Sequence, residues 1–437
     1  MIKILILSYH YPPDNIIAAR RAEAYARHLH KFGIYPTIIT DRFEKVWDKQ
    51  GNWAGYKNHD IFEKPIIKEY DSHRVIRMPR IVTPLQRFQK IMERIPLLSP
   101  LFTFFMNLLG HFDMHLLAHN TNYKNYLRAH LKNHKYDLVV TLFSPYFPVR
   151  IAYTLHKEFK IPYVCDFRDH YDNKLLNPFY KPPFFRRITN KLKQNHIKTW
   201  LAKSGFLTAV STTIADSLSK LSGVKGFEIT NGFEPSYYQN NYNETFNKFT
   251  ISHVGTFYPE QDISVLINGV ATFIKENEAE DFRLKFIGLK LMNQEQQDFI
   301  KQRIDSKYLE LQGRVDYNQA LSIMQKSHIL FYPAWTLIKG IYSGKIFEYL
   351  GARRPILVSP GNKDLVEKLI GETSSGSIAN TPQEVCTFIT EKYNEWKQTG
   401  RVSYNGIEEE IMKYTRENQV KKMAELIHNF LPAKSNR

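Results

Sequence analysis

Residues 342–359 read YSGKIFEYLGARRPILVS, and they carry the strongest structural prediction in the chain. Ser343 and Gly344 are small and let a backbone approach a ligand closely. The apolar spacing of KIFEYLGA predicts a helix with one buried face and a single carboxylate, Glu348. The Arg-Arg-Pro that follows ends this helix, and PILVS predicts a buried strand. The helix N-terminus and Lys345 suit a phosphate, while Glu348 suits sugar hydroxyls.

This stretch resembles the donor-site motif of the retaining glycosyltransferases of family 4, which have the two-domain GT-B fold. In that family a glutamate, seven residues and a second glutamate in a KxxEYLA-like helix precede a Pro-led strand. Glu348 stands at the second glutamate, and the resemblance implies that it binds the nucleotide ribose. The first glutamate would fall at position 340, which is Gly340 here. The alternative is an ordinary amphipathic helix before a strand.

The composition is typical of a globular protein. Of 437 residues, 43% are hydrophobic and 24% are charged, and at about 150 residues per domain the length predicts two to three domains. Cys165 and Cys386 are too few for a disulfide framework and fit a reducing cytosol. The N-terminal apolar run reads as a strand rather than a secretory signal. No run reaches the roughly 18 apolar residues of a spanning helix, so we expect a cytoplasmic protein.

The positive charge is concentrated in the first half of the chain. Residues 1–240 contain 35 Lys and Arg against 19 Asp and Glu, whereas residues 241–437 contain 25 against 24. Such asymmetry predicts an anionic partner, either a membrane surface, a lipid-linked phosphate or nucleic acid; a merely solubilising surface is the alternative. Because no nucleic-acid-binding module is recognisable, we expect no nucleic-acid partner.

The chain opens with a strand–helix–strand pattern. IKILIL at residues 2–7 and YPTIIT at residues 35–40 predict two strands of a parallel sheet, with a helix between them. The dinucleotide fingerprint G-x-G-x-x-G is absent after the first strand, which argues against an NAD-dependent enzyme. In the resembled family this first loop lines the acceptor side, which implies an acceptor contact for Asn15.

Residues 72–130 show the least regular pattern. The segment IPLLSPLFTFFMNLLGHF at residues 95–112 is strongly apolar and follows a group of basic residues, Arg77, Arg80, Arg87, Lys90 and Arg94. Basic residues beside an apolar, aromatic-rich segment are typical of a surface that enters the headgroup layer of a membrane. A helix pair that covers the sheet explains the same pattern, and both interpretations stay open.

A second group of candidates follows the strands predicted in YDLVVTLFSPYF and IPYVCDFRDH. Ligands of parallel sheets collect at the carboxyl ends of the strands, which makes Ser144 and Asp166 candidate acceptor-binding residues. DFRDHYDN is similar to a D-x-RD motif of polysaccharide-assembling bacterial members of family 4. Asp169 would orient an acceptor hydroxyl or take its proton, and Arg168 would hold an anionic acceptor or diphosphate. The alternative is an Arg–Asp ion pair that only shapes the loop.

In the second half, HVGTFYPEQ resembles the start of the family's nucleotide-binding domain. The family usually has an arginine after the glycine and a lysine five residues later, where this chain has Thr256 and Gln261. Binding of the diphosphate is therefore left to Lys345, backbone amides and Arg314, whose neighbourhood would cradle the base. The predicted donor-binding residues are Gly255, Thr256, Arg314, Val315, Ser343, Gly344, Lys345, Ile346 and Glu348.

These patterns predict an α/β protein with two Rossmann-like domains that face each other across a cleft, as in the GT-B fold. The predicted acceptor-binding domain covers residues 1–240, and the predicted donor-binding domain covers residues 248–411. The polar segment QNNYNETFNK marks the boundary between them. A C-terminal helix at about 412–437 is expected to cross back onto the first domain.

The resemblance implies a retaining glycosyltransferase of cell-surface polysaccharide assembly. It would move a sugar from a nucleotide-diphosphate sugar to a lipid-linked or glycan acceptor, with Glu348, Arg168 and Asp169 as the catalytic residues. No metal or other cofactor is expected, since no His, Asp and Cys cluster has ligand spacing. The basic half suggests peripheral contact with the inner face of the plasma membrane. The alternative is a non-catalytic GT-B binding partner of a glycan-assembly complex, indicated by Gly340, Thr256 and Gln261.

Overall fold

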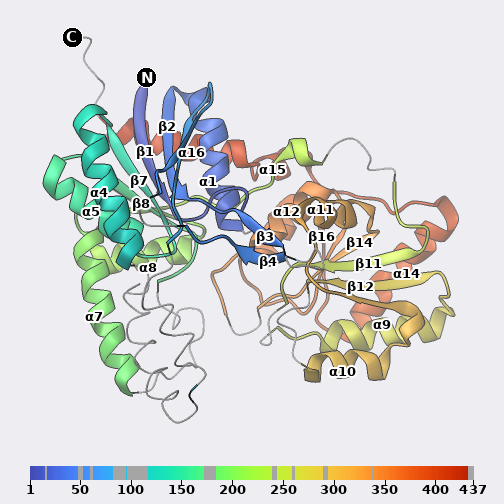
Figure 1. Ribbon diagram of the computed structural model, residues 1–437. Helices are drawn as coiled ribbons and strands as arrows, with labels where there is room; N and C mark the ends of the chain where they lie inside the picture. Colours follow the sequence, from blue (N-terminus) through green and yellow to red (C-terminus); the bar gives the residue numbers. More distant parts are fainter. Residues whose placement is uncertain are drawn as a thin grey trace. The chain divides into compact units, whose positions relative to one another are not determined.

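The computed structural model describes residues 1–14, 17–47, 53–59, 63–81, 95, 117–171, 184–238, 244–257, 261–288, 294–335 and 338–431. These residues form two compact units, each an α/β layer structure (Figure 1). Unit 1 contains the described residues of 1–230 together with those from 420 onward, and unit 2 contains those of 231–419. The division falls at the Asn231–Gly232 turn, upstream of the polar segment that was predicted as the boundary.

Unit 1 is built on a sheet that is parallel except for one edge strand. Its described strands follow the order β10–β9–β8–β7–β1–β2–β6–β5, and only β5 is antiparallel to its neighbour. Residues 4–7 of β1 are buried, as expected for a strand that is covered on both faces. The strands are β1 (Ile2–Ser8), β2 (Ile34–Asp41), β5 (Ile66–Glu69), β6 (Arg74–Met78), β7 (Leu138–Phe143), β8 (Tyr163–Phe167), β9 (Leu207–Ala209) and β10 (Gly226–Glu228), with a separate hairpin of β3 (Lys45–Trp47) and β4 (Trp53–Tyr56).

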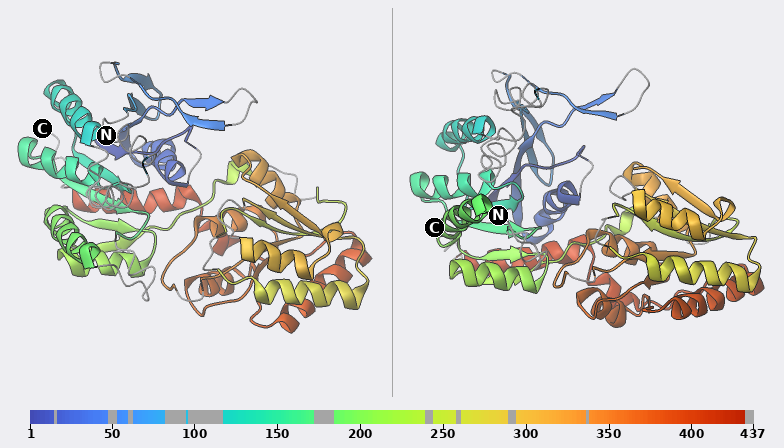
Figure 2. Two further views of the ribbon diagram at one scale, coloured as in Figure 1. Left: turned by 60° about the horizontal axis from the view of Figure 1, so that its bottom comes forward. Right: turned by 90° about the horizontal axis from the view of Figure 1, so that it is seen from below.

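Helices cover both faces of this sheet, as Figure 2 shows from two sides. One face packs against α4 (Leu117–Asn133), α5 (Phe147–Phe159), α7 (Phe184–Leu201) and α8 (Thr212–Ser222). The opposite face packs against α1 (Ile17–His28), which continues into the short η1 (Leu29–Phe32), and against α16 (Arg416–Phe430). The Ser211 side chain caps α8 by accepting a hydrogen bond from the Ile214 amide at 3.3 Å.

Unit 2 is a second doubly wound unit whose described strands are all parallel. Their order is β13–β12–β11–β14–β15–β16, the 3-2-1-4-5-6 order of a Rossmann-like sheet. The strands are β11 (Phe249–Val254), β12 (Phe282–Ile287), β13 (Leu309–Gln312), β14 (Ile329–Tyr332), β15 (Ile356–Val358) and β16 (Gly376–Ile378). The chain order reverses between β11 and β14, so this is the point at which ligands of such sheets bind.

The helices of unit 2 also divide between the two faces of its sheet. One face packs against α9 (Ser264–Asn277), α10 (Gln294–Arg303) and α14 (Pro382–Thr399). The other packs against α11 (Tyr317–Lys326), α12 (Gly344–Ala352), α13 (Leu365–Thr373) and α15 (Glu408–Met412). Two short 3₁₀ helices, η3 (Pro235–Tyr237) and η5 (Ser306–Tyr308), complete the unit.

Two chain segments connect the units, and each is held by backbone hydrogen bonds. The Phe233 amide donates to the Tyr414 carbonyl at 3.2 Å, and the Arg416 amide donates to the Phe233 carbonyl at 2.8 Å. The second segment then continues as α16, whose later residues Val420, Met423, Ala424 and Ile427 are buried in the core of unit 1. The predicted α/β class and the C-terminal helix that returns to the first domain are therefore confirmed.

The apolar segment predicted either to contact a membrane or to cover the sheet lies almost wholly outside the described residues. Of the basic residues before it, Arg77 and Arg80 are described. The Arg77 guanidinium lies 5.7 Å from the centre of the Tyr11 ring, and Arg80 donates to Asn58 at 3.1 Å. In the part of the chain that the structure describes, no helix is long and apolar enough to span a membrane.

Replacement of Ile427 by alanine tests whether α16 belongs to the core of unit 1. Ile427 is fully buried, so Ile427→Ala is expected to cost about 2–5 kcal/mol of the free energy of unfolding. Calorimetry should show a lower melting temperature for the transition of unit 1. Glu425→Ala, an exposed position of the same helix, is the control and should leave that transition within about 0.5 kcal/mol. Equal effects of the two variants would contradict the packing described.

Candidate functional site

Two glycines shape the strand ends at the switch point of unit 2. Gly255 follows β11 with a φ of 126°, and Gly288 follows β12 with a φ of 99°, both in the region that favours glycine. A Cβ on Gly288 would lie 2.8 Å from the Gly255 carbonyl oxygen, and one on Gly255 would lie 3.2 Å from Cε of Lys345. The glycines thus allow two backbones and one lysine side chain to converge at the ends of these strands.

The N-terminus of α12 lies at the same place. Ser343 is its N-cap, and its hydroxyl accepts a hydrogen bond from the Lys345 amide at 3.4 Å. The predicted donor residues Ser343, Gly344 and Lys345 therefore share one helix terminus, where amides and the helix dipole favour an anion. The side chain of Ile346 is instead fully buried in the core of unit 2, and its amide donates to the Ser343 carbonyl at 3.2 Å.

Lys345 reaches from this helix to the end of β11. Its Nζ donates to the Thr256 carbonyl at 2.6 Å and to Nε2 of His253 at 3.1 Å. Nδ1 of His253 donates in turn to the Phe331 carbonyl of β14 at 3.1 Å. Burial lowers the pKa of Lys345 to about 7, and it also lowers the pKa of His253 well below its usual range. The structure thus brings together the predicted residues Gly255, Thr256 and Lys345.

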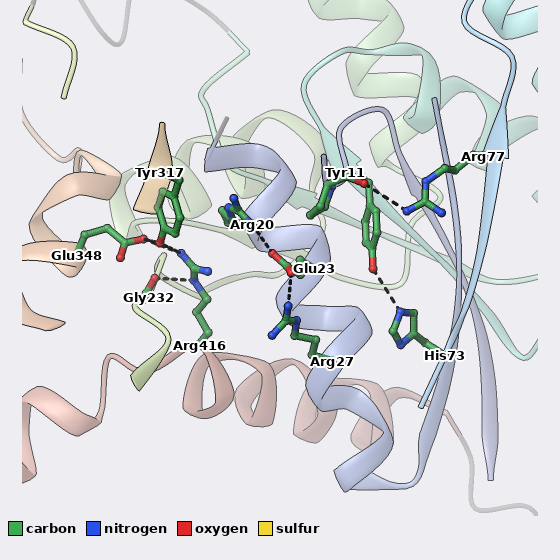
Figure 3. A network of polar contacts seen from close by, with 11 residues as sticks. Tyr11, Arg20, Glu23, Arg27, His73, Arg77, Gly232, Tyr317, Glu348 and Arg416 are labelled. Carbon is green, nitrogen blue, oxygen red and sulfur yellow. Dashed lines mark hydrogen bonds and ion pairs between the residues drawn. The ribbon is translucent and has the colours of Figure 1, made fainter. Parts of the chain in front are cut away.

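Glu348 lies one turn further along α12, at the centre of a buried polar cluster (Figure 3). Its Oε1 accepts from the Tyr317 hydroxyl at 2.9 Å and from the Arg416 guanidinium at 2.6 Å, and its Oε2 accepts from the Tyr238 hydroxyl. Arg416 also donates to the Gly232 carbonyl at 3.0 Å. Both carboxylate oxygens already have protein partners, so a role in ribose binding stays a prediction.

Arg314 and Val315 follow β13 and precede α11. Asp316 caps α11, with its carboxylate accepting from the Gln319 amide at 2.9 Å and the Gln319 side chain reaching back to the Asp316 amide. Arg314 is exposed, and Val315 packs partly against the core. This places the two predicted base-binding residues on the turn that leads to Tyr317, the partner of Glu348.

Two positions that differ from the resembled family serve as structural contacts. The amide of Gly340, which has a φ of 76°, donates to the Asp364 carboxylate. Gln261 is buried, and its side-chain nitrogen donates to the Pro333 carbonyl at 2.8 Å. A glutamate at position 340 would adopt a left-handed conformation that side chains disfavour, so the backbone here fits the glycine.

Unit 1 has a smaller candidate site at the carboxyl ends of β1, β7 and β8. A small cavity there is lined by Ser8, His10, Ala18, Arg21, Leu142, Phe143, Ser144, Asp166 and Arg168. The cavity lies where the strand order reverses between β1 and β7, as expected for a ligand site of a parallel sheet. It unites three residues that the sequence placed at strand ends, Ser144, Asp166 and Arg168. The remaining acceptor candidate, Asn15, lies outside the described residues.

Asp166 makes structural contacts in the interior of unit 1. It is 1% exposed, and its carboxylate accepts from Arg21 at 2.6 and 2.7 Å, from the Thr208 hydroxyl at 2.7 Å and from the Tyr25 hydroxyl at 3.1 Å. Arg21 also donates to the Ile229 carbonyl at 3.0 Å and to the Thr230 carbonyl at 2.9 Å. These donors engage both carboxylate oxygens, so Asp166 has a structural role, and its acceptor role stays a prediction.

Arg168 and Asp169 form an ion pair at the mouth of this site. Nε of Arg168 donates to Oδ2 of Asp169 at 3.0 Å, and the two side chains are 21% and 52% exposed. The ion pair that was the alternative interpretation is thus present, and its exposure leaves both side chains accessible to an acceptor. The neighbouring His170 is buried, with Nε2 2.9 Å from the Ser217 hydroxyl.

Several residues of these sites were not identified from the sequence. Gly288 follows a strand directly, and a glycine in this position could have indicated the site from the sequence. His253 lies at the start of the quoted segment HVGTFYPEQ, two residues before Gly255, which could have indicated it. Tyr238, Tyr317 and Arg416 come from separate segments, and no local pattern marks them. Across the described residues, no group of three or more His, Cys, Asp or Glu side chains is arranged to hold a metal ion.

Neither the protein-family models nor the curated proteins contain a match to this chain. Solved structures do match it over nearly its whole length. Sucrose-phosphate synthase from Thermosynechococcus elongatus has 12% identity and a TM-score of 0.58, covering 99% of this chain and 100% of that one. HepE from Anabaena, in complex with UDP and glucose, has 13% identity and a TM-score of 0.57, covering 98% and 100%. A UDP-forming α,α-trehalose-phosphate synthase from Burkholderia vietnamiensis has 9% identity and a TM-score of 0.59, covering 99% and 100%.

This chain has the GT-B fold. At these sequence identities the likeness establishes the architecture alone. The chemistry of this chain depends on the residues of its own candidate sites. The GT-B likeness also agrees with the two parallel sheets described above, each with its own switch point.

Substitution of Asp166 separates a structural role from an acceptor-binding role. Asp166→Ala leaves the Arg21 guanidinium buried without its carboxylate, and we expect a loss of about 3–5 kcal/mol in the free energy of unfolding. Urea denaturation measures this loss. The matched control is Arg21→Met with Asp166→Leu, which removes both charges and should cost less than the single change. Wild-type stability of Asp166→Ala would contradict the structural role.

Lys345 makes stability depend on pH in a defined direction. Because burial lowers its folded-state pKa to about 7 from the ordinary value of 10.5, the unfolded chain binds more protons between these values. Its contribution to the free energy of unfolding is therefore fully favourable above the unfolded pKa and is lost as the pH falls toward 7. The melting temperature of the wild type, relative to Lys345→Met, should rise from pH 7 to pH 9.5. A constant difference would show that the amine stays charged in the folded protein.

Proposed function

We propose that this chain is a glycosyltransferase that moves a sugar from a nucleotide-diphosphate sugar to an acceptor hydroxyl. The observation that carries the proposal is the convergence of a helix N-terminus and a buried lysine at the switch point of unit 2. Lys345 reaches there from the first turn of α12 and contacts the backbone that follows β11. Similarity to solved glycosyltransferases, one of them in complex with UDP and glucose, supports this choice.

The donor diphosphate would bind against the α12 N-terminus, Lys345 and the turn at Gly255. Stabilisation of the departing nucleotide diphosphate is the main catalytic task in such a transfer, and preorganised amides and cations perform it electrostatically. Thr256 and Gln261 supply no charge. Lys345 would therefore neutralise the diphosphate charge that two cations neutralise in the resembled family. Arg314 and Val315 would contact the base, and the remaining acceptor capacity of Glu348 would serve the ribose.

The acceptor would bind at the strand ends of unit 1. Arg168 is suited to hold a phosphate or carboxylate of the acceptor, and the exposed Asp169 is suited to orient its hydroxyl. The basic excess of residues 1–240 favours an anionic acceptor, such as a lipid-linked phosphate or a charged glycan. Within this proposal the reaction retains anomeric configuration and serves cell-surface polysaccharide assembly, at the inner face of the plasma membrane.

A second candidate function is that of a non-catalytic GT-B partner in a glycan-assembly complex. The observation in its favour is the engagement of Glu348 by Tyr238, Tyr317 and Arg416. If these contacts persist in every state, the carboxylate stabilises unit 2 and takes no part in donor binding. Catalytic turnover separates the two candidates, because only an enzyme consumes a nucleotide sugar.

Ligand-induced stabilisation is the first test of the donor site. A panel of nucleotide sugars, beginning with UDP-glucose and GDP-mannose, should contain at least one member that raises the melting temperature by roughly 5 °C at a hundredfold excess over Kd. Lys345→Met should abolish the shift by removing the amine. Lys368→Met, an exposed lysine of α13 in the same unit, is the control and should keep it. A well-folded protein that no member stabilises would contradict the donor site.

Turnover of the same nucleotide sugar tests catalysis. We expect release of the nucleoside diphosphate, by transfer or hydrolysis, and a roughly hundredfold lower kcat in Asp169→Asn if this carboxylate acts as the base. Donor binding by Asp169→Asn should be unchanged, because the residue lies in unit 1. Tight donor binding without any turnover, with every acceptor class supplied, would favour the non-catalytic partner.

A further inference from the structure

We propose that binding of the nucleotide sugar takes up one proton, that the amine of Lys345 acquires it, and that His253 is the residue that positions this amine. The inference rests on the proposed donor site and concerns how that site becomes charged. It makes Lys345 a conditional cation, which is neutral in the empty site above neutral pH and positive in the occupied one.

The hydrogen bonds of Nζ support this proposal. Nζ has two acceptors among the described residues, the Thr256 carbonyl oxygen at 2.6 Å and Nε2 of His253 at 3.1 Å. A neutral amine has two hydrogens, and these two acceptors take both of them. An ammonium group has a third hydrogen, for which the described part of the chain supplies no further hydrogen-bond acceptor.

His253 can accept from Lys345 only as one neutral tautomer. Its Nδ1 faces the Phe331 carbonyl at 3.1 Å, and a carbonyl only accepts, so Nδ1 carries the ring proton. Nε2 then presents a lone pair toward Lys345. A protonated His253 would set two positive charges 3.1 Å apart in the interior, which fits the strong lowering of the His253 pKa by burial and by Lys345.

Among the residues that the structure describes, the other titratable groups around Lys345 provide no counter-charge. Tyr349, on the same helix, accepts at its hydroxyl from the Val254 amide at 2.9 Å, and Tyr332 of β14 accepts from the Ser343 amide at 3.4 Å. Burial raises the pKa of both phenols, so both stay neutral. Glu348, three residues on, is engaged by Arg416. Burial is accordingly the cause that lowers the pKa of Lys345 to about 7.

A diphosphate would change this balance. Its oxygens would accept the third ammonium hydrogen, and its negative charge would favour the protonated amine over the neutral one. The proton comes from solvent, and no covalent bond forms or breaks. Because a nucleotide sugar has no phosphate group that titrates near neutral pH, the proton taken up reports the protein alone. Binding should therefore be stronger at pH 6, where the amine is already charged, than at pH 8.

Isothermal titration calorimetry with UDP-glucose and GDP-mannose tests the inference. Heats measured in two buffers of different ionisation enthalpy, HEPES and Tris at pH 8 and MES and Bis-Tris at pH 6, give the number of protons taken up. From a pKa of about 7, we expect an uptake of about 0.9 proton at pH 8 and about 0.1 at pH 6, with a Kd about tenfold higher at pH 8. Lys345→Arg keeps a permanent charge and should show no uptake.

Variants of His253 test its positioning role. His253→Gln retains a donor for Phe331 and an acceptor for Lys345, so the pH midpoint of binding should be kept. His253→Leu removes the acceptor, and the midpoint should move to lower pH because the ammonium loses a charge-assisted hydrogen bond. A residue that only filled space would leave the midpoint unchanged in both variants.

The outcomes distinguish this inference from the proposed function. Binding of either nucleotide sugar without proton uptake at pH 8 overturns the inference and leaves the donor site intact. Uptake that persists in Lys345→Arg and Lys345→Met assigns the proton to another group and also overturns it. No binding heat with either nucleotide sugar overturns the proposed donor site, and the inference with it.

Discussion

The burial of one amine at the end of a parallel sheet is the constraint on which the candidate donor site depends. Lys345 lies on a helix that is buried from Lys345 to Ala352, so its side chain must find partners in the interior. It finds them in a backbone carbonyl and a neutral imidazole, and the glycines after β11 and β12 provide the space. A Cβ on Gly288 would clash with the Gly255 carbonyl, and one on Gly255 would press against Cε of Lys345.

One buried arginine in each unit follows the same pattern, in which the guanidinium is shared between a carboxylate and backbone carbonyls. Arg21 contacts Asp166 and two carbonyls in unit 1, and Arg416 contacts Glu348 and one carbonyl in unit 2. Such pairs contribute little net stability but are costly to break. They fix the position of the segment from Ile229 to Gly232. This gives these buried charges a geometric role. Lys345 is different, because the described residues around it include no carboxylate partner.

Much of the fold and part of the sites could be predicted from the sequence. Apolar runs such as IKILIL and the helix of residues 344–352 depend on local periodicity, which the sequence displays directly. Lys345, Thr256 and Gly255 were also predicted together. The side-chain partners were not, because Tyr238, Tyr317 and Arg416 reach Glu348 from segments far apart in the chain. The contacts of Asp166 were not predicted for the same reason: its position at a strand end was visible, but the guanidinium that contacts it comes from α1.

The first connection between the units is held by one arginine on each side. Arg21 of unit 1 holds the Thr230 carbonyl, Arg416 of unit 2 holds the Gly232 carbonyl, and Asn231 alone lies between them. The chain is therefore fixed on both sides of this one residue. The same guanidinium that holds Gly232 also holds Glu348. A ligand that competes for this carboxylate would thereby loosen the connection. The flexibility of the chain there and the occupancy of the ligand site would then depend on the same set of hydrogen bonds.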